Sequence, residues 1–222
     1  MAQHPSTPER ILEAARYYFN ESGYAATTLV EIASSVGISQ GNLTYHFPTK
    51  RNLAVRLRER AQARIAARRA AHRPGAIVDD YVEHLLFAMD LTWSYRFLLR
   101  DRAQFADEIE ADMPPAEMVA DLGELRGLID RIAAAGMFRR GITVDLDALT
   151  RSLWIVSRYW MDHLSEMERL GTVTWDDQER GIHHHFTVLV SYLTTPARRQ
   201  LEAALRRAAV AGQRPLHTDQ TR

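Results

Sequence analysis

Apolar side chains recur every three to four residues along almost the whole chain, and runs that alternate apolar and polar positions are nearly absent. The first spacing is typical of an amphipathic helix, and the second would indicate a half-buried strand. The sequence therefore predicts an all-α protein.

Four helices are predicted in the first third of the chain. Residue pairs with the spacing of a capping box start the first two, and a glycine ends each of them. Pro48 stops the third, because the residue before a proline is pushed out of the helical region. The four helices are expected from Ser6 or Thr7 to Gly23, from Thr28 to Gly37, from Gln40 to His46, and from Thr49 to about Ala71.

The second and third of these helices have the features of a helix-turn-helix. Ala33 is small where the two helices would cross, and Gly37 can adopt the left-handed conformation that a sharp turn requires. Leu43 gives the third helix an apolar face, and Ile38 and Phe47 can pack beneath it. Short helices followed by a long one, with this turn between them, predict a three-helix DNA-binding domain.

Six further helices are predicted beyond the break at residues 73–75, and together they form a large helical body. They are expected near Ile77–Arg100, Ala103–Ala111, Pro115–Phe138, Leu146–Leu170, Asp176–Leu193 and Ala197–Ala211. The polar residues that follow, 212–222, are expected to be a frayed tail.

Composition narrows the class of protein. The 222 residues are 46% hydrophobic, with 28 basic and 28 acidic side chains and no cysteine, which excludes disulfides and thiol chemistry. Through residue 73 there are eleven basic and five acidic side chains, so the first third is basic and the rest is acidic. A basic segment favours a polyanionic partner. With neither an export signal nor a membrane span expected, the predicted location is the cytoplasm.

Residues 23–50 resemble the N-terminal signature of the tetracycline-repressor (TetR) family of bacterial regulators. The resemblance is carried by Gly23-Tyr24, by Thr27 to Ala33, and by the run from Val36 to Lys50, with Thr44 standing where an aromatic residue is common. It covers about residues 7–55, and Tyr95 to Asp101 is a fainter match.

The resemblance implies a homodimer that binds a near-palindromic operator on double-stranded DNA and represses a promoter. A small-molecule effector, expected to be apolar, would fill the C-terminal domain and release the DNA. The implied organisation is a helix-turn-helix DNA-binding domain at residues 1–50, which includes the start of the long connecting helix, a helical ligand-binding and dimerisation domain at 51–211, and the tail at 212–222.

The N-terminal part of the third helix is expected to enter the major groove. Its polar side chains are candidates for base contact, because amide groups pair well with adenine edges. These candidates are Gln40, Asn42 and Thr44.

Hydroxyl, imidazole and ammonium donors near the helix N-termini suit phosphates. The backbone candidates are Thr28, Tyr45, His46, Thr49 and Lys50. Thr28 and Thr49 can equally be helix caps, and Tyr45 and His46 can be packing groups.

The long C-terminal helices carry apolar stripes that could pair with their copies in a four-helix dimer interface. The interface candidates are Leu153, Trp160, Leu164, Met167, Ile182, Phe186, Leu189 and Leu193. The alternative is that these stripes face the core of their own subunit.

Aromatic and methionine side chains among the middle helices offer bulk for a ligand pocket, although such residues are more often packing. The pocket candidates are Met89, Trp93, Phe97, Phe105, Met118, Leu125, Ile129, Trp154 and Tyr159.

Other functions are weighed against this one. His183, His184 and His185 invite a metal interpretation, but consecutive helical residues point about 100° apart and cannot share one ion unaided. These histidines could instead make dimerisation sensitive to pH. A helical-bundle enzyme is the alternative class, and the sequence has none of the usual catalytic or cofactor motifs, so no cofactor is expected. An architectural DNA-binding protein would not need so large a body.

Overall fold

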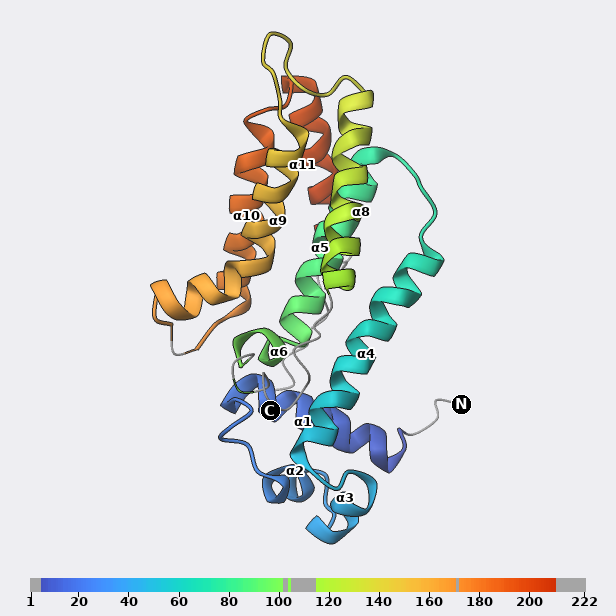
Figure 1. Ribbon diagram of the computed structural model, residues 1–222, viewed down its shortest axis with the longest axis vertical. Coiled ribbons are helices and arrows are strands. Elements are labelled where there is room, and N and C mark those ends of the chain that lie inside the picture. The colour runs from blue at the N-terminus through green and yellow to red at the C-terminus, as the bar shows by residue number, and fades with distance from the viewer. Residues whose placement is uncertain (1–4, 102–103, 105–114, 171, 211–222) are drawn as a thin grey trace. The chain divides into compact units, whose positions relative to one another are not determined.

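The computed structural model describes residues 5–101, 104, 115–170 and 172–210 of the chain. The chain divides into two compact units, and Figure 1 labels their helices. Unit 1 comprises residues 1–72 and 94–113, and unit 2 comprises residues 73–93 and 114–222. The described residues are predominantly helical and contain no strand beyond an isolated bridge between Phe138 and Leu193. The prediction of an all-α protein is confirmed.

Unit 1 contains the predicted helix-turn-helix. Its helices are α1 (Thr7–Ser22), α2 (Leu29–Ser35), α3 (Gln40–His46), α4 (Lys50–Ala71) and the short α6 (Phe97–Arg100). Capping boxes start α1, α2 and α4, where Ser6, Thr28 and Thr49 are the N-caps. Because these caps satisfy backbone N–H groups within a few residues of sequence, the helix starts were readable from sequence alone.

The core of unit 1 joins the first four helices. Fully buried side chains come from each of them, including Phe19 of α1, Ile32 of α2, Leu43 of α3 and Leu53 of α4. The long helix α4 therefore belongs to the DNA-binding unit through its first turns. The boundary expected after residue 50 differs from this division, because Leu53 and Leu57 of α4 complete the core of unit 1.

A distant segment, residues 94–101, completes unit 1. The side-chain amide of Asn20, which is 4% exposed, donates to the Ser94 carbonyl at 2.9 Å and accepts from the Phe97 N–H at 3.2 Å. The Arg100 guanidinium donates to the Phe19 and Asn20 carbonyls at 2.7 and 2.8 Å. The last turn of α1 has no basic residue of its own, so Arg100 supplies the positive charge that the carbonyl end of a helix favours.

The end of that segment also orders the chain before α2. A carboxylate oxygen of Asp101 accepts from the Tyr24 N–H at 2.8 Å, and Asp101 is held by Arg100 at 2.9 Å. The stretch from Tyr95 to Asp101, which the sequence matched only faintly to the family, is thus part of the scaffold of the DNA-binding unit.

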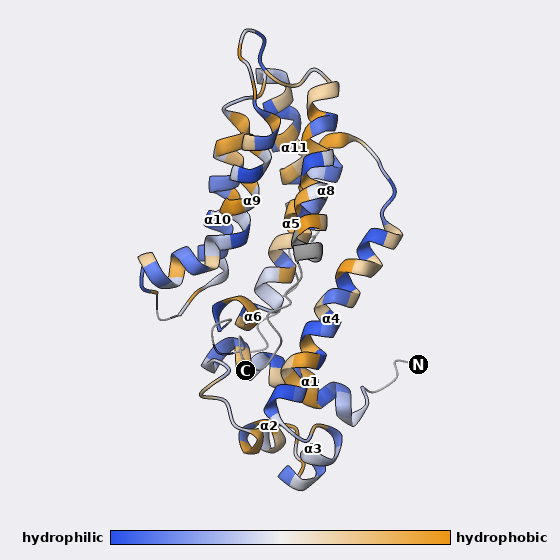
Figure 2. Cartoon of the chain, viewed as in Figure 1, coloured by the Kyte–Doolittle hydropathy of each residue, from blue (hydrophilic) through white to orange (hydrophobic). Residues whose placement is uncertain are grey.

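Unit 2 is a helical bundle. Its elements are α5 (Ile77–Ser94), α8 (Pro115–Ala134), α9 (Leu146–Asp162), the π-helical turn η1 (His163–Met167), α10 (Trp175–Val190) and α11 (Thr195–Val210). The helix α9 packs against both α8 and α10. Bands of hydrophobic and hydrophilic residues repeat along these helices, as expected for amphipathic helices that share a core (Figure 2).

Most predicted helices of the body are present, with shifted ends. The expected helix at 77–100 is divided at Tyr95 and Arg96 into α5 and α6, and the expected helix at 146–170 changes to a π-helical turn after Asp162. The helix expected at 103–111 and the tail at 212–222 lie outside the described residues. Among the described helices, none is both long and apolar enough to cross a membrane.

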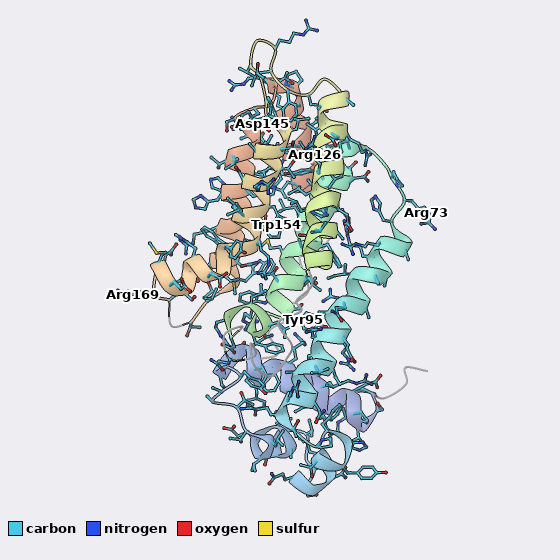
Figure 3. The ribbon with its side chains drawn as sticks, viewed as in Figure 1. Arg73, Tyr95, Arg126, Asp145, Trp154 and Arg169 are labelled. Atoms are coloured by element: carbon cyan, nitrogen blue, oxygen red, sulfur yellow. The ribbon has the colours of Figure 1, made fainter. Side chains whose placement is uncertain are left out.

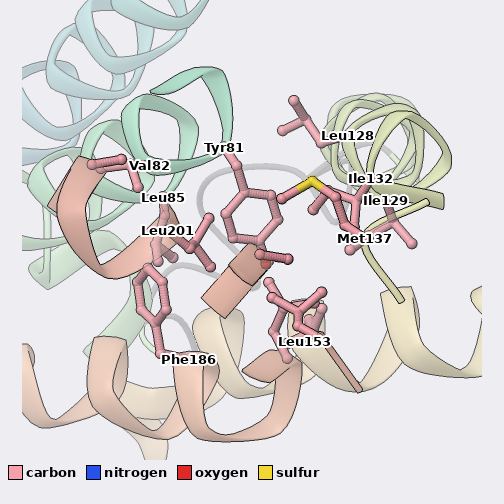
Figure 4. Close-up of a cluster of buried hydrophobic side chains, with 14 of the residues drawn as sticks. Tyr81, Val82, Leu85, Leu128, Ile129, Ile132, Met137, Leu153, Phe186 and Leu201 are labelled. Atoms are coloured by element: carbon pink, nitrogen blue, oxygen red, sulfur yellow. The ribbon is translucent and has the colours of Figure 1, made fainter. Parts of the chain in front are cut away.

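The core of unit 2 surrounds a tyrosine. Tyr81 of α5 is fully buried against Ile129, Ile132 and Leu153 (Figure 4). Its hydroxyl lies 2.6 Å from Nε2 of His185, an imidazole that is 2% exposed. Two polar groups are buried here together because each satisfies the other.

Loss of the Asn20 side chain is expected to destabilise unit 1. In Asn20→Ala the Ser94 carbonyl and the Phe97 N–H lose the Asn20 amide, and the Arg16 guanidinium at 3.3 Å still donates to Ser94, so the free energy of unfolding should fall by about 1–2 kcal/mol. Urea unfolding of the full chain measures this loss, with Asn42→Ala, at an exposed position, as the matched control. Equal unfolding curves for both variants would show that the 94–101 segment does not support unit 1.

His185 is expected to make unit 2 sensitive to acid. Burial, with a smaller effect of His84, lowers the pKa of His185 to about 3 from its ordinary 6.5, and Tyr81 and Ser157 are its hydrogen-bond partners. As pH falls below about 6.5, the imidazole of His185 binds a proton in the unfolded chain but not in the folded chain. The free energy of unfolding therefore falls by up to about 1.4 kcal/mol per pH unit because of this residue.

The variant His185→Gln should flatten the dependence of unfolding free energy on pH between about pH 6.5 and 4. The control His183→Gln removes an exposed imidazole and should leave the slope unchanged. Urea unfolding across this pH range measures the slope of unfolding free energy against pH for each variant. Equal slopes for His185→Gln and His183→Gln would show that His185 is not the source of the acid sensitivity.

Candidate DNA-binding surface

The turn between α2 and α3 is fixed by backbone and side-chain contacts. Gly37 has φ of +71°, in the left-handed region that favours glycine. Its N–H donates to the Ser34 carbonyl at 3.1 Å, and the Ile38 N–H donates to the Ala33 carbonyl at 3.0 Å. The Arg10 guanidinium of α1 donates to the Val36 carbonyl at 2.5 Å. The turn is therefore held both by its own backbone and by α1.

The third helix, α3, presents a polar face. Ser39 caps it by accepting from the Asn42 N–H at 3.2 Å, and Leu43 turns inward with no exposed surface. Tyr45 lies two residues further on, on the opposite side of the helix, and is 83% exposed. The residues beside it on this face, Gly41 and Asn42, are exposed as well.

The three candidates for base contact have different hydrogen-bonding capacity. Gln40 and Asn42 are exposed amides that can each donate and accept. The Thr44 hydroxyl donates to the Gly41 carbonyl at 3.1 Å, which leaves its lone pairs and its methyl group for DNA. Thr44 can therefore accept from a base or contact a thymine methyl, whereas an amide can donate and accept at once in a bidentate pair with a base.

Two helix N-termini lie within unit 1 next to the candidates for backbone contact, and they differ in charge. At α2, the Thr28 hydroxyl donates to the Glu31 carboxylate at 2.8 Å. Hydrogen bonds from Thr28 hold the pKa of Glu31 below its usual range, so this cap carries a negative charge. At α4, the Thr49 hydroxyl donates instead to the neutral amide of Asn52 at 2.7 Å. A phosphate is better accommodated at the N-terminus of α4, where no carboxylate repels it.

Lys50 has partners inside the protein. Its ammonium donates to the backbone carbonyls of Tyr24, Ala25 and Thr27 at 2.7, 3.1 and 3.0 Å. It also lies 4.6 Å from the centre of the Tyr24 ring. An ammonium has three N–H donors, and these three carbonyls use them. The sequence led us to expect a DNA phosphate as the anion that offsets a lysine at a helix N-terminus. The structure shows three carbonyl oxygens around this ammonium, and the phosphate contact stays a prediction.

The other two backbone candidates differ in exposure. Tyr45 presents most of its ring to solvent, whereas His46 is half-buried and its ring lies 5.3 Å from that of Tyr45. Arg51, in the first turn of α4, is exposed and was not among the candidates. Its position after the N-cap Thr49 could have identified it.

The pocket candidates do not form one group. Met89 lines a cavity in unit 2, and Trp93 packs edge-on against Trp175 at 5.6 Å. Leu125 and Ile129 belong to the main core of unit 2. Phe97 lies in the other unit, packed against Phe19.

Two further pocket candidates lie near the surface of α9. Trp154 is labelled in Figure 3, and its indole donates to the Asp121 carboxylate at 2.7 Å. Tyr159 is 37% exposed. The side chains of Phe105 and Met118 lie outside the described residues.

Most interface candidates pack within their own subunit. Their low exposure favours packing against the core of their own subunit over contact with a second copy. Buried in this way are Leu153, Trp160, Leu164, Phe186, Leu189 and Leu193. Ile182 is half-buried beside the cavity, and Met167 is 74% exposed. The large apolar side chains that α9 exposes are Ile155 and Tyr159, one turn apart.

The three consecutive histidines face different surroundings. His185 is buried next to Tyr81, the His184 ring lies 4.9 Å from that of Trp160, and His183 is exposed. Within the part of the chain that the structure describes, no group of three or more His, Asp or Glu side chains is arranged to hold a metal ion.

The fold and this surface define a helix-turn-helix DNA-binding protein, and comparison with known families gives its class. The model for bacterial regulatory proteins of the tetR family matches residues 11–57, and the TetR model described as a bacterial transcriptional repressor matches residues 60–201. The chain therefore belongs to the TetR family and is a transcriptional regulator.

Relatives and solved structures agree with this assignment. The chain is 27% identical over 175 residues to the HTH-type transcriptional regulator RutR of Escherichia coli K12, covering 76% of this chain and 80% of RutR. It is 34% identical over 76 residues to the repressor AcnR of Corynebacterium diphtheriae, which covers 34% of this chain and 40% of AcnR. A TetR-family regulator from Marinobacter aquaeolei VT8 has the same fold, with a TM-score of 0.63, 24% identity, and coverage of 91% of this chain and 98% of that one.

Lys50 and Arg51 are expected to differ in what they do for DNA binding. Lys50→Met leaves three carbonyls without their donor and should lower the free energy of unfolding by about 1–2 kcal/mol. Arg51→Ala should leave stability unchanged, weaken all DNA sequences alike, and reduce the salt slope of binding by about one per subunit.

Unfolding curves and affinities at several salt concentrations separate the two effects. If Lys50→Met reduced the salt slope as Arg51→Ala does and left unfolding unchanged, Lys50 would be a phosphate contact instead of a scaffold residue.

Proposed function

We propose that this regulator acts as a homodimer that represses transcription from a near-palindromic operator and leaves it when a small molecule binds unit 2. The observation that carries the proposal is the exposed polar face of α3, capped at Ser39 and anchored by Leu43 within a matched TetR domain. A bacterial DNA-binding regulator of this kind works on the chromosome, so the proposed location is the cytoplasm.

In this proposal Gln40, Asn42 and Thr44 contact base edges in the major groove. The two amides discriminate between bases by bidentate pairing, and Thr44 adds an acceptor and a methyl contact. Gly41 has no side chain, which permits close approach of the helix to the DNA. Base contacts of this kind specify the sequence.

Phosphate contacts fix the position of α3 in the groove. We assign them to Tyr45, to His46, and to the N-terminus of α4 at Thr49 and Arg51, where the cap is neutral. Thr28 can reach a phosphate only beside the Glu31 carboxylate, so its contribution is smaller. Lys50 acts through the scaffold, by holding the turn that leads into α2.

The dimer is proposed to form through exposed faces of α9 and α10, because TetR-family regulators typically dimerise and an operator with two half-sites requires two copies of α3. On α9, Ile155 and Tyr159 are 47% and 37% exposed and one helical turn apart, which forms a short apolar stripe. On α10, Thr187 is exposed and Val188 half-buried. The dimer must place its two α3 helices about 34–36 Å apart, one turn of DNA.

A small-molecule effector is the remaining part of the proposal. A regulator from Saccharomonospora viridis with a TM-score of 0.59, 18% identity, and coverage of 79% of this chain and 93% of that one is described in complex with choline. Release requires that the effector bind the DNA-free conformation more tightly than the DNA-bound one.

A footprint of the purified protein on DNA flanking its own gene tests the function. A regulator protects a near-palindromic site, and its affinity falls steeply as salt rises. Sedimentation of Ile155→Glu alongside the unaltered chain tests the dimer at the same time. Absence of any protected site, or a chain that sediments as a monomer on its operator, would refute the proposal.

Individual base contacts are expected to be separable from phosphate contacts. Asn42→Ala should cost about 1–3 kcal/mol per half-site on the operator and relax preference at one base pair, and Gln40→Ala should do so at another. Gln200→Ala, at an exposed position of α11, is the matched control. Binding to a library of operator variants measures the effect, and a loss that was uniform across the library would show that these amides do not read bases.

A further inference from the structure

A small cavity in unit 2 lies between α5, α9 and α10. It encloses about 30 Å³, which is room for about two water molecules. Leu85 and Met89 of α5, Trp160 of α9 and Ile182 of α10 give it apolar walls. Its polar side chains come from α9 and α10, where Ser157 and Gln178 lie, and from Thr92 of α5. The residues that line this cavity include none that ionises.

Gln178 carries a polar atom that lacks a partner. The residue is 4% exposed, and among the described residues its amide oxygen, Oε1, accepts no hydrogen bond. A buried acceptor without a donor is unfavourable, because folding removes its hydrogen bonds to water and no hydrogen bond within the protein replaces them. A molecule in the cavity that offers an N–H or O–H group to Gln178 removes this cost.

Ser157, on the adjacent helix, has one hydrogen bond, and its direction decides whether the Ser157 hydroxyl can donate to a ligand in the cavity. Its Oγ lies 2.8 Å from Nδ1 of His185, and Nε2 of the same ring lies 2.6 Å from the Tyr81 hydroxyl. Burial lowers the pKa of His185 to about 3, so the ring is neutral and has one N–H.

The direction of this chain of hydrogen bonds follows from Tyr81. Burial raises the pKa of the Tyr81 phenol, which therefore keeps its proton, and the described residues give that proton no acceptor other than Nε2. Tyr81 thus donates to Nε2, and Nδ1 carries the ring proton, which Ser157 and the Leu153 carbonyl can accept. The Ser157 hydroxyl proton remains available to an acceptor in the cavity.

The walls also indicate how a ligand fits. Trp160 is fixed, because its indole donates to the Asp177 carbonyl at 2.8 Å and its ring leaves no space for a side chain at Gly181, where an added Cβ would lie 2.6 Å from Cδ1. Met89 is buried but has a long unbranched side chain, which repacks readily. A ligand larger than the cavity therefore makes space by displacing Met89.

We propose that this cavity binds the effector, and that the effector is a small neutral molecule carrying a hydrogen-bond donor for Gln178 and an acceptor for Ser157 on an apolar body. The inference rests on the proposed ligand-released repressor and names its ligand class. Amides combine both groups in one uncharged unit. A carboxylate offers no donor to Gln178, and an ammonium offers no acceptor to Ser157. Either ion would also lose its hydration against walls that hold no opposite charge.

The test uses benzamide as the probe and three matched compounds as controls. Benzoate lacks the donor, N,N-dimethylbenzamide lacks the N–H groups but keeps the acceptor, and benzylamine is a cation. Binding to the full chain without DNA is followed by the indole N–H resonance of Trp160, identified with Trp160→Phe. We expect saturable binding of benzamide, and binding at least about tenfold weaker for each control.

Variants assign the contacts. Gln178→Leu should weaken benzamide about tenfold and raise the melting temperature of the ligand-free chain, because it removes the unpartnered oxygen. Ser157→Ala should weaken benzamide by a similar factor. The exposed change Gln200→Ala should alter neither. Because Gln178→Leu is expected to be stable, loss of binding in that variant cannot be attributed to misfolding.

Three results would overturn the inference: no saturable shift by benzamide up to about 20 mM, equal or tighter binding of benzoate, or unchanged benzamide affinity in Gln178→Leu. DNA binding measured in parallel separates the two proposals. If the chain binds its operator and benzamide does not bind, the proposed function is supported and the proposed class of effector is refuted. If benzamide binds as expected and no DNA is bound, the proposed function fails instead.

Discussion

The recognition helix is too short to exist by itself, and this constraint determines the rest of unit 1. The α3 helix has seven residues, whereas isolated helices below about 12–15 residues are marginal in water. Its stability must come from Leu43 and Phe47 in the shared core, from the Ser39 cap, and from the turn at Gly37. The polar face toward DNA contributes none of this, so its residues can vary with the operator while the buried side stays fixed.

The same constraint explains why long polar side chains in unit 1 point toward backbone. Arg10 holds the Val36 carbonyl, Lys50 holds the turn before α2, and Arg100 holds the end of α1. In each case a cation occupies carbonyl oxygens that water would otherwise solvate, and it connects segments that are distant in sequence. A cation used in this way still adds positive charge near the DNA, but its donors serve the protein. Basic residues in a DNA-binding unit therefore divide into those that position α3 and those that meet phosphate.

How far the sequence predicted the structure depends on the range of each interaction. The capping boxes at Ser6 and Thr28, the N-cap at Thr49 and the turn at Gly37 involve residues within a few positions of one another, and all four are where the pattern placed them. The partners of Lys50 are about twenty-five residues away in the chain, and no local pattern records them.

The body of the protein was harder to interpret for a different reason. An apolar stripe has the same chemistry whether it faces its own core or a second subunit, so the burial of Leu153 and Leu189 could not be separated from an interface by spacing alone. The place of Phe97 could not be deduced for a similar reason, since its neighbour Phe19 is in the first helix. His185 is buried, unlike its two neighbours, because successive residues of a helix point in different directions and this one points toward Tyr81.

The buried polar groups of unit 2 show how a binding site and a stable core can share one set of helices. Tyr81 and His185 are as deeply buried as Gln178, yet they satisfy each other, so they stabilise one packing of α5 against α10. The amide oxygen of Gln178, on the same helix, has no donor among the described residues, so a donor placed in the cavity would stabilise it. One helix, α5, carries Met89 at the cavity and, five residues later, Ser94, whose carbonyl accepts from Asn20. If a ligand binds this cavity as proposed, only a difference in its affinity for two conformations of the protein can change the occupancy of DNA.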